Sequence, residues 1–200
     1  MAQGDQGLGG EAGVSAAAAS IGLFRRPFCF VRHGETESNL RHTIAGSLDV
    51  ALTERGRAQA RAAAAAIGNR KIGAIYSSGL VRAHETALII GAGIGLPVTV
   101  IADLAERNWG ELEGRPRALQ AQMTTPPGAE SPQEFAARVV RGLGTIATAG
   151  LPLVVAHSGV FRVLCRTLGI DEPADPVANC RPLRFEPPDG NNPVWRIEAL

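Results

Sequence analysis

Lysine is almost absent from this chain of 200 residues, and long apolar runs are missing altogether. Of the 20 basic residues, 19 are arginine and only Lys71 is lysine, so an isolated arginine carries little information about a site. The formal net charge of +1 is too small to imply binding to nucleic acid or to a membrane surface through bulk charge. The apolar stretches also fall far short of the roughly 20 residues needed to cross a bilayer.

Cysteine is scarce as well. Three cysteines, odd in number and without metal-ligand spacing, argue against a disulfide framework: Cys29, Cys165 and Cys180. We expect them to be small apolar residues in a cytoplasmic protein. The first 24 residues contain no Lys or Arg and so lack the basic start of a secretory signal. We interpret residues 1–26, which are rich in Gly and Ala, as a tail outside the core.

Short apolar runs alternate with helix-like segments through residues 27–200. Thr53 is a predicted helix cap, Ser131-Pro132-Gln133-Glu134 is a predicted capping box, and the helix after His157 is predicted to stop near Gly169. The predicted strands are Phe28–Arg32, Gly73–Tyr76, Pro97–Ile101, Leu151–Ala156, Arg184–Glu186 and Val194–Glu198. Several are apolar throughout, which is typical of a mostly parallel sheet covered by helices on both faces. The predicted fold class is therefore α/β: a single domain with three α/β/α layers, in which the polar segment 107–130 forms a small cap.

Residues suited to binding an anion follow three of the predicted strands. Arg32 and His33 end the first strand, Arg82 comes soon after the second, and His157 follows a late strand. Because the carboxyl ends of parallel strands meet at one edge of the sheet, we expect these four side chains to converge there. Ser78, at the predicted start of a helix, would add free backbone N–H groups and the positive end of the helix dipole.

Such a pocket fits a phosphoryl group. Two guanidiniums can neutralise a phosphate dianion, and a neutral imidazole can attack phosphorus to give a covalent intermediate. A second imidazole, if protonated, would add a donor, and a carboxylic acid could protonate the leaving oxygen. Several residues are candidates for that acid by their chemistry: Glu35, Glu106, Glu111, Glu113 and Glu130.

The run Arg32-His33-Gly34-Glu35-Thr36 resembles the signature of the histidine phosphatase superfamily, the phosphoglycerate-mutase-like family. Four further motifs resemble that family in its order and spacing: Ser78–Ala87, Leu104–Gly114, Gly128–Ser131 and Val155–Gly159. The resemblance covers roughly residues 28–198, and the combination is far more specific than any one motif.

The resemblance implies phosphoryl transfer without a metal ion or another cofactor. It implies that His33 is the nucleophile, and family position alone selects Glu106 as the proton donor. It implies contacts to the phosphoryl group from Arg32, Asn39, Arg82, His157 and Ser158. Ser158 stands where the family usually has glycine, but its backbone N–H is unchanged.

The leading hypothesis is a phosphomonoesterase that acts on a small-molecule phosphomonoester, with neither nucleic acid nor a membrane as partner. One alternative is a phosphoglycerate mutase, against which Ala45 and the short segment 115–127 speak. Another is a non-catalytic phosphoryl-binding module, although both histidines, both arginines and Glu106 are retained. The substrate stays open among sugar phosphates, phosphoglycerates, α-ribazole phosphate and phosphoproteins, and so does the oligomeric state.

Overall fold

The computed structural model describes residues 21–147, 149–172 and 177–200. In this part of the chain six strands form one sheet in the order β3-β2-β4-β1-β5-β6. The strands are β1 Phe28–Arg32, β2 Ile72–Ser77, β3 Val98–Val100, β4 Leu151–Ala156, β5 Leu183–Glu186 and β6 Arg196–Ala199. Strands β3, β2, β4 and β1 are parallel, whereas β5 and β6 pair antiparallel. The predicted mostly parallel sheet is confirmed.

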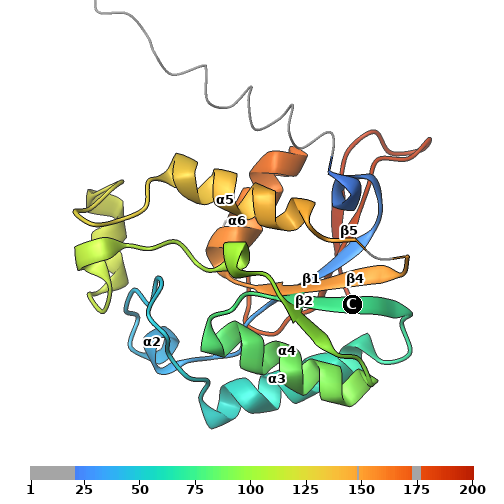
Figure 1. Ribbon diagram of the computed structural model, residues 1–200, viewed down its shortest axis with the longest axis horizontal. Coiled ribbons are helices and arrows are strands. Elements are labelled where there is room, and N and C mark those ends of the chain that lie inside the picture. The colour runs from blue at the N-terminus through green and yellow to red at the C-terminus, as the bar shows by residue number, and fades with distance from the viewer. Residues whose placement is uncertain (1–20, 148, 173–176) are drawn as a thin grey trace, which may run out of the picture.

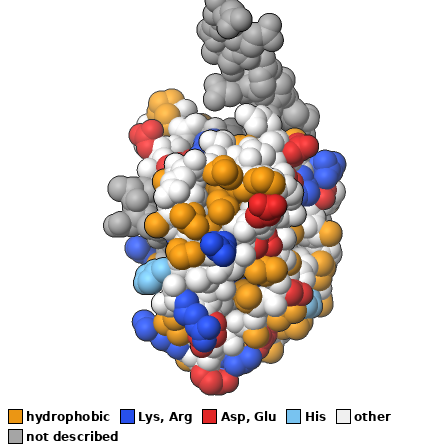
Figure 2. Space-filling view, turned by 90° about the vertical axis from the view of Figure 1, so that its left-hand side faces the viewer, with side chains coloured by type: hydrophobic (Ala, Val, Ile, Leu, Met, Phe, Trp, Pro, Cys, Tyr) orange, Lys and Arg blue, Asp and Glu red, His pale blue; other side chains and the backbone are white. Residues whose placement is uncertain are grey.

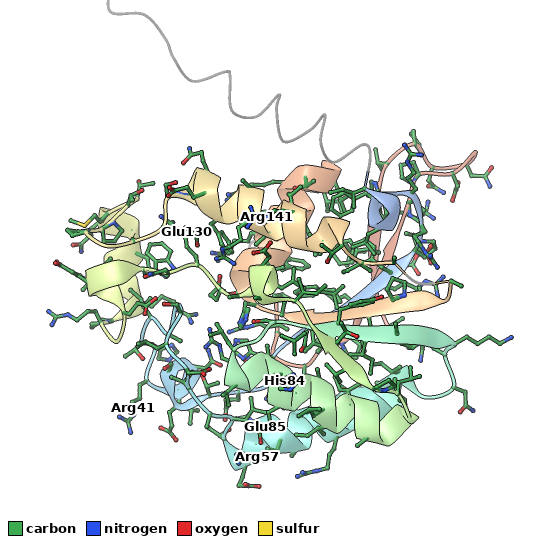
Figure 3. The ribbon with its side chains drawn as sticks, viewed as in Figure 1. Arg41, Arg57, His84, Glu85, Glu130 and Arg141 are labelled. Carbon is green, nitrogen blue, oxygen red and sulfur yellow. The ribbon has the colours of Figure 1, made fainter. Side chains whose placement is uncertain are left out.

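Helices cover both faces of this sheet, which confirms the predicted three layers (Figure 1). The longer ones are α3 Glu54–Ile67, α4 Val81–Ile94, α5 Pro132–Gly144 and α6 Ser158–Leu168. Figure 1 shows α3 and α4 on one side of the sheet and α5 and α6 on the other. An ion pair of 2.6 Å between Arg57 of α3 and Glu85 of α4 joins the first two (Figure 3).

Each face of the sheet carries its own apolar cluster. Toward α5 and α6 the cluster is aromatic, and Phe28 stacks on Phe185 with 4.6 Å between ring centroids. Toward α3 and α4 it is built from smaller side chains such as Ala60 and Ala87, together with Cys29 of β1. A strand covered on both faces is apolar along its length, which explains the unbroken apolar run 28–31 of β1 before Arg32 at its end.

Helices α3, α5 and α6 begin or end where the sequence signals predict. Thr53 accepts the N–H of Gly56 at the start of α3. Ser131 and Glu134 form the predicted reciprocal capping box at the start of α5. Gly169, with φ +67°, follows α6 in the left-handed conformation that glycine adopts without strain. These local interactions set the helix boundaries independently of the tertiary contacts.

Residues 21–26 differ from the prediction of a tail outside the core. Gly22–Arg25 forms the 3₁₀ helix η1, and Leu23, only 1% exposed, belongs to the aromatic cluster. Contact with the cluster removes the apolar surface of Leu23 from water, and this burial stabilises the docked position of η1. Residues 1–20, the rest of the predicted tail, lie outside the described residues.

The segment 107–130 is irregular, as expected for a cap. It contains two 3₁₀ helices, η3 Gly110–Leu112 and η4 Arg117–Gln122, after the short η2 Ala102–Leu104. Figure 2 shows the left-hand side of Figure 1, where this segment and the short helix α2 Glu37–Leu40 lie. Hydrophobic side chains gather on that face, with basic side chains beside and below them. Among the described residues, no helix is long and apolar enough to cross a membrane.

Candidate active site

A cavity of about 310 Å³ lies beyond the carboxyl ends of β1 and β4. Its wall combines the end of β1, the loop after α2, the cap segment and the first half of α6. Six of the predicted site residues line it: Arg32, His33, Asn39, Arg82, Glu106 and Ser158. The cap adds Arg107, Trp109, Arg117 and Gln120 to the wall. Side chains far apart in the sequence therefore meet around one space, as the strand-end argument predicts.

His33 is held with one ring nitrogen occupied and the other available. The backbone N–H of His33 donates to Ala156 O at 2.9 Å, which continues the pairing of β1 with β4. Nδ1 lies 2.7 Å from Gly34 O, and since a carbonyl oxygen only accepts, Nδ1 carries the proton and Nε2 the lone pair. Burial, with the charges of Arg82 and Arg32, lowers the pKa of His33 well below 6.5. The ring is neutral at physiological pH.

Backbone carbonyls anchor the two predicted phosphate-binding guanidiniums. Arg32 Nη1 donates to Val177 O at 2.7 Å. Arg82 Nη1 donates to Leu48 O at 2.8 Å and Nη2 to Gly46 O at 2.7 Å. The Nε atoms of both arginines are buried without a partner in the described part of the chain. Each arginine therefore keeps a buried donor that no described residue uses, and an unpaired buried donor costs free energy.

His157 lies beside His33, fully buried, with 5.2 Å between the ring centroids, and does not itself line the cavity. Its Nε2 is 2.8 Å from Ser78 Oγ, which also accepts the N–H of Leu80 at 3.2 Å. Nδ1 has no partner among the described residues, and it carries the ring proton in the tautomer in which Ser78 donates to Nε2. Burial and the charge of Arg82 lower the pKa of His157 well below 6.5, so the ring is neutral.

Positive charge dominates the cavity. Burial lowers the pKa of Arg32 to about 10, and the nearby charge of Arg117 adds to the effect. Glu106 acts in the opposite direction and raises the pKa of both Arg32 and Arg82. In the described part of the chain, no three His, Cys, Asp or Glu side chains gather in a group that could hold a metal ion. The electrostatics therefore favour an anionic ligand.

Among the described residues that line the cavity, Glu106 is the one with a carboxylate side chain. Its Oε1 accepts the N–H of Arg107 and its Oε2 the N–H of Gly159, both at 2.9 Å. The other candidate carboxylates make different contacts: Glu35 with Thr53, Glu113 with Ser47, and Glu130 with Arg138, while Glu111 is exposed. Figure 3 labels Glu130 near the start of α5. The geometry thus singles out the carboxylate that the family resemblance selects.

Asn39 presents its amide with a defined orientation. Its Oδ1 accepts the N–H of Thr36 at 3.1 Å and the hydroxyl of the same residue at 3.2 Å, in the capping box of α2. Asn179 Nδ2 donates to the same oxygen at 3.4 Å. Because Oδ1 is used in this way, Nδ2 is the group that Asn39 can offer to the cavity.

Helix α6 begins in the cavity wall, whereas the prediction that a helix begins at Ser78 is wrong. The N–H of Ser78 donates to Val155 O at 3.0 Å, which keeps this residue in line with the sheet. Helix α4 begins only at Val81, whose N–H donates to Asp49 Oδ1 at 2.7 Å. Helix α6 begins at Ser158, in the cavity wall.

Sequence reasoning missed the segment that follows α6. Asn179 Nδ2 donates to His33 O at 2.7 Å, and the N–H of Cys180 donates to Arg32 O at 2.9 Å. Val177 O accepts from Arg32, as described above. These residues fix the end of β1 from a loop about 146 positions away, and no local pattern marks them.

Comparisons with known proteins agree with this geometry. The model of the histidine phosphatase superfamily (branch 1) matches residues 28–181. Phosphoglycerate mutase-like protein 4 of Arabidopsis thaliana is 38% identical over 154 residues, which cover 67% of each chain. The uncharacterized phosphatase PhoE of Bacillus subtilis is 32% identical over 151 residues, 72% of this chain and 78% of that one. The structure of a mycobacterial glucosyl-3-phosphoglycerate phosphatase in complex with VO₃ matches with a TM-score of 0.71 and 29% identity, and covers 88% of this chain and 98% of that one.

Proposed function

The chain belongs to branch 1 of the histidine phosphatase superfamily, and we propose that it is a phosphomonoesterase that works through a phosphohistidine at His33 on a small phosphorylated metabolite. One observation carries this proposal. Three buried polar atoms without partners among the described residues lie on groups around the neutral imidazole: Arg32 Nε, Arg82 Nε and His157 Nδ1. A bound phosphate dianion would accept from all three and remove the cost of leaving them unpaired.

The first chemical step transfers the phosphoryl group to the protein. Nε2 of His33 attacks phosphorus, so that a P–N bond forms while the bond to the ester oxygen breaks. The two guanidiniums and the Nδ1–H of His157 stabilise the charge on the equatorial oxygens. The electron pair of the broken bond stays on the leaving oxygen, which takes a proton from Glu106.

The second step returns the protein to its starting state. Glu106, now ionised, accepts a proton from a water molecule whose oxygen attacks phosphorus. The P–N bond breaks, its electron pair returns to Nε2 of His33, and inorganic phosphate leaves. The two backbone N–H groups that hold Glu106 support this dual role, because they fix the carboxylate in one orientation through both steps.

Turnover of p-nitrophenyl phosphate in excess EDTA tests the proposal. We expect the wild-type protein to turn over and to yield a phosphoenzyme on quenching with alkaline denaturant, which preserves a P–N bond. His33→Ala should lose activity by at least about a thousandfold and yield no phosphoenzyme. His42→Asn is the matched control, because His42 is exposed, lies outside the cavity wall and has a φ of +52° that asparagine tolerates. Activity retained in His33→Ala would overturn the proposal.

A phosphoglycerate mutase remains the alternative within the family. Ala45 lines the cavity and presents a methyl group where phosphoglycerate-binding relatives place a small polar residue, which supports the phosphatase. A coupled assay with 3-phosphoglycerate and its bisphosphate cofactor compares the two activities. A mutase flux well above the hydrolytic flux would reverse the order of the two hypotheses. Phosphate binding without a trapped phosphoenzyme would instead indicate the non-catalytic module.

A further inference from the structure

The carboxylate of Glu113 joins the cap segment to the loop after α2. Its Oε1 accepts three hydrogen bonds: from Ser47 N–H at 2.6 Å, from the Ser47 hydroxyl at 2.9 Å and from Trp109 N–H at 3.0 Å. Oε2 is 3.1 Å from the same hydroxyl. Glu113 is not among the residues that line the cavity, so substrate binding does not explain these contacts.

The loop packs directly against this carboxylate. Gly46 has φ +52°, and a Cβ built there would lie 2.1 Å from Oε1 and 2.7 Å from Cδ of Glu113. No side chain larger than hydrogen fits between them. The carboxylate of Glu113 is therefore in direct contact with the backbone at Gly46 and Ser47.

The same stretch of backbone holds Arg82. The carbonyls of Gly46 and Leu48, on either side of Ser47, accept from the two terminal nitrogens of the guanidinium. On the far side, Asp49 accepts the N–H of Val81 at the start of α4. The loop 46–49 is thus held at one end by Glu113 and at the other by the first turn of α4. Its carbonyls bind the guanidinium of Arg82.

Backbone pairing keeps the cap in place independently of this carboxylate. Gly114 N–H donates to Ile44 O at 2.8 Å, and Ile44 N–H donates to Arg115 O at 2.9 Å. Arg117 N–H donates to His42 O at 2.8 Å. Loss of the carboxylate would therefore leave the cap attached and act on the loop that carries the two carbonyls.

We propose that Glu113 is a positioning residue for phosphoryl transfer, which fixes the carbonyls of Gly46 and Leu48 and through them the guanidinium of Arg82. Its negative charge also raises the pKa of Arg82, against the lowering by burial. The inference rests on the proposed function only in that Arg82 binds the phosphoryl group. Glu113 itself touches neither the phosphoryl group nor the reacting atoms.

Single substitutions give the first test, with binding of inorganic phosphate by calorimetry and kcat and KM for p-nitrophenyl phosphate as readouts. We expect Glu113→Ala to weaken phosphate binding and lower kcat/KM by about tenfold, the loss of one to two hydrogen bonds to a charged group. Glu113→Gln keeps an acceptor oxygen for Ser47 and should recover part of the loss. Glu111→Ala, in η3 two positions before Glu113 and with an exposed side chain, should match the wild type.

A double-mutant cycle separates positioning from a general loss of structure. If Glu113 acts through Arg82, Glu113→Ala should cost nothing further in an Arg82→Lys background but keep its full cost in Arg32→Lys. Equal costs in both backgrounds, or unchanged phosphate binding in Glu113→Ala, would overturn the inference. If Glu113→Ala does not fold, the same cycle is run with Glu113→Gln. Phosphate binding without turnover in the wild type would count against the proposed function alone.

Discussion

Gly159 donates its N–H to Glu106 Oε2 at 2.9 Å, and the two residues are packed so closely that no side chain fits between them. A Cβ built on Gly159 would lie 2.0 Å from Oε1 of Glu106 and 3.0 Å from the ring of Phe135. The first turn of α6 thus both binds the proposed proton donor and limits where it can lie. The backbone of Gly159 is helical, so glycine is not needed for its conformation. It is needed because Glu106 approaches its Cα closely.

We expect Gly159→Ala to lower kcat for a phosphate ester of an aliphatic alcohol by about a hundredfold, because the new methyl group displaces Glu106 from the position in which it would protonate the leaving oxygen. Steady-state kinetics, with thermal unfolding to confirm the fold, measure the effect. Gly144→Ala is the control, since a Cβ at Gly144 meets only Ile21 at an ordinary 3.6 Å. A kcat unchanged in Gly159→Ala would show that the position of the carboxylate does not limit the rate.

We expect Glu106→Gln to reduce kcat/KM by about 10²–10⁴-fold for esters of aliphatic alcohols, because the glutamine amide cannot protonate an alkoxide. For p-nitrophenyl phosphate the reduction in kcat/KM should be smaller, because p-nitrophenolate leaves without a proton. The measurement is kcat/KM for a series of monoesters with leaving groups of increasing pKa, since this parameter does not include the second step, in which Glu106 is the proposed base. A loss of kcat/KM independent of the leaving group would exclude Glu106 as the general acid.

We expect the protein to become less stable as the pH falls below about 6.5, the pKa of histidine in the unfolded chain. In the folded state the pKa values of His33 and His157 are well below this. The unfolded state then binds protons that the folded state does not, so the stability present above pH 6.5 is lost on acidification, by up to about 1.4 kcal/mol per pH unit for each histidine. Urea unfolding between pH 7.5 and 5 measures the slope, and His157→Gln should flatten it. An equally steep slope in that variant would contradict the assignment.

We expect Leu23→Ala to destabilise the protein by about 2–5 kcal/mol, as for other fully buried leucines. The reason is the cavity it would leave in the aromatic cluster, although Leu23 lies within the predicted tail. Urea denaturation gives the free energy of unfolding. Leu40→Ala, at a side chain that is 50% exposed, should change it by less than about 0.5 kcal/mol. A similar small change in Leu23→Ala would show that residues 21–26 are not part of the core.

The elements with strong local signals could be predicted from the sequence. The run of β1, the Thr53 cap and the Ser131 capping box each depend on neighbouring residues, and all three lie where predicted. Parallel strands bring their carboxyl ends together, so the meeting of Arg32 and His33 with residues after β4 also followed.

The parts of the site that depend on distant backbone could not be predicted. Every residue has a carbonyl, so nothing in the sequence marks Gly46 and Leu48 as the partners of Arg82, or Val177 as the partner of Arg32. The start of α4 was placed too early because Ser78 resembles a cap, whereas its N–H completes the sheet beside β4.

Because the loop 177–180 is synthesised late, it affects when the nascent chain can assemble the site around His33. Arg32 and His33 leave the ribosome early, but the groups that hold them, Val177 and Asn179, are added about 145 positions later. Strand β4, on the other side of β1, is also a late addition. A nascent or prematurely terminated polypeptide would thus carry His33 without the groups that hold it, so the proposed phosphoryl transfer would begin only once folding is complete.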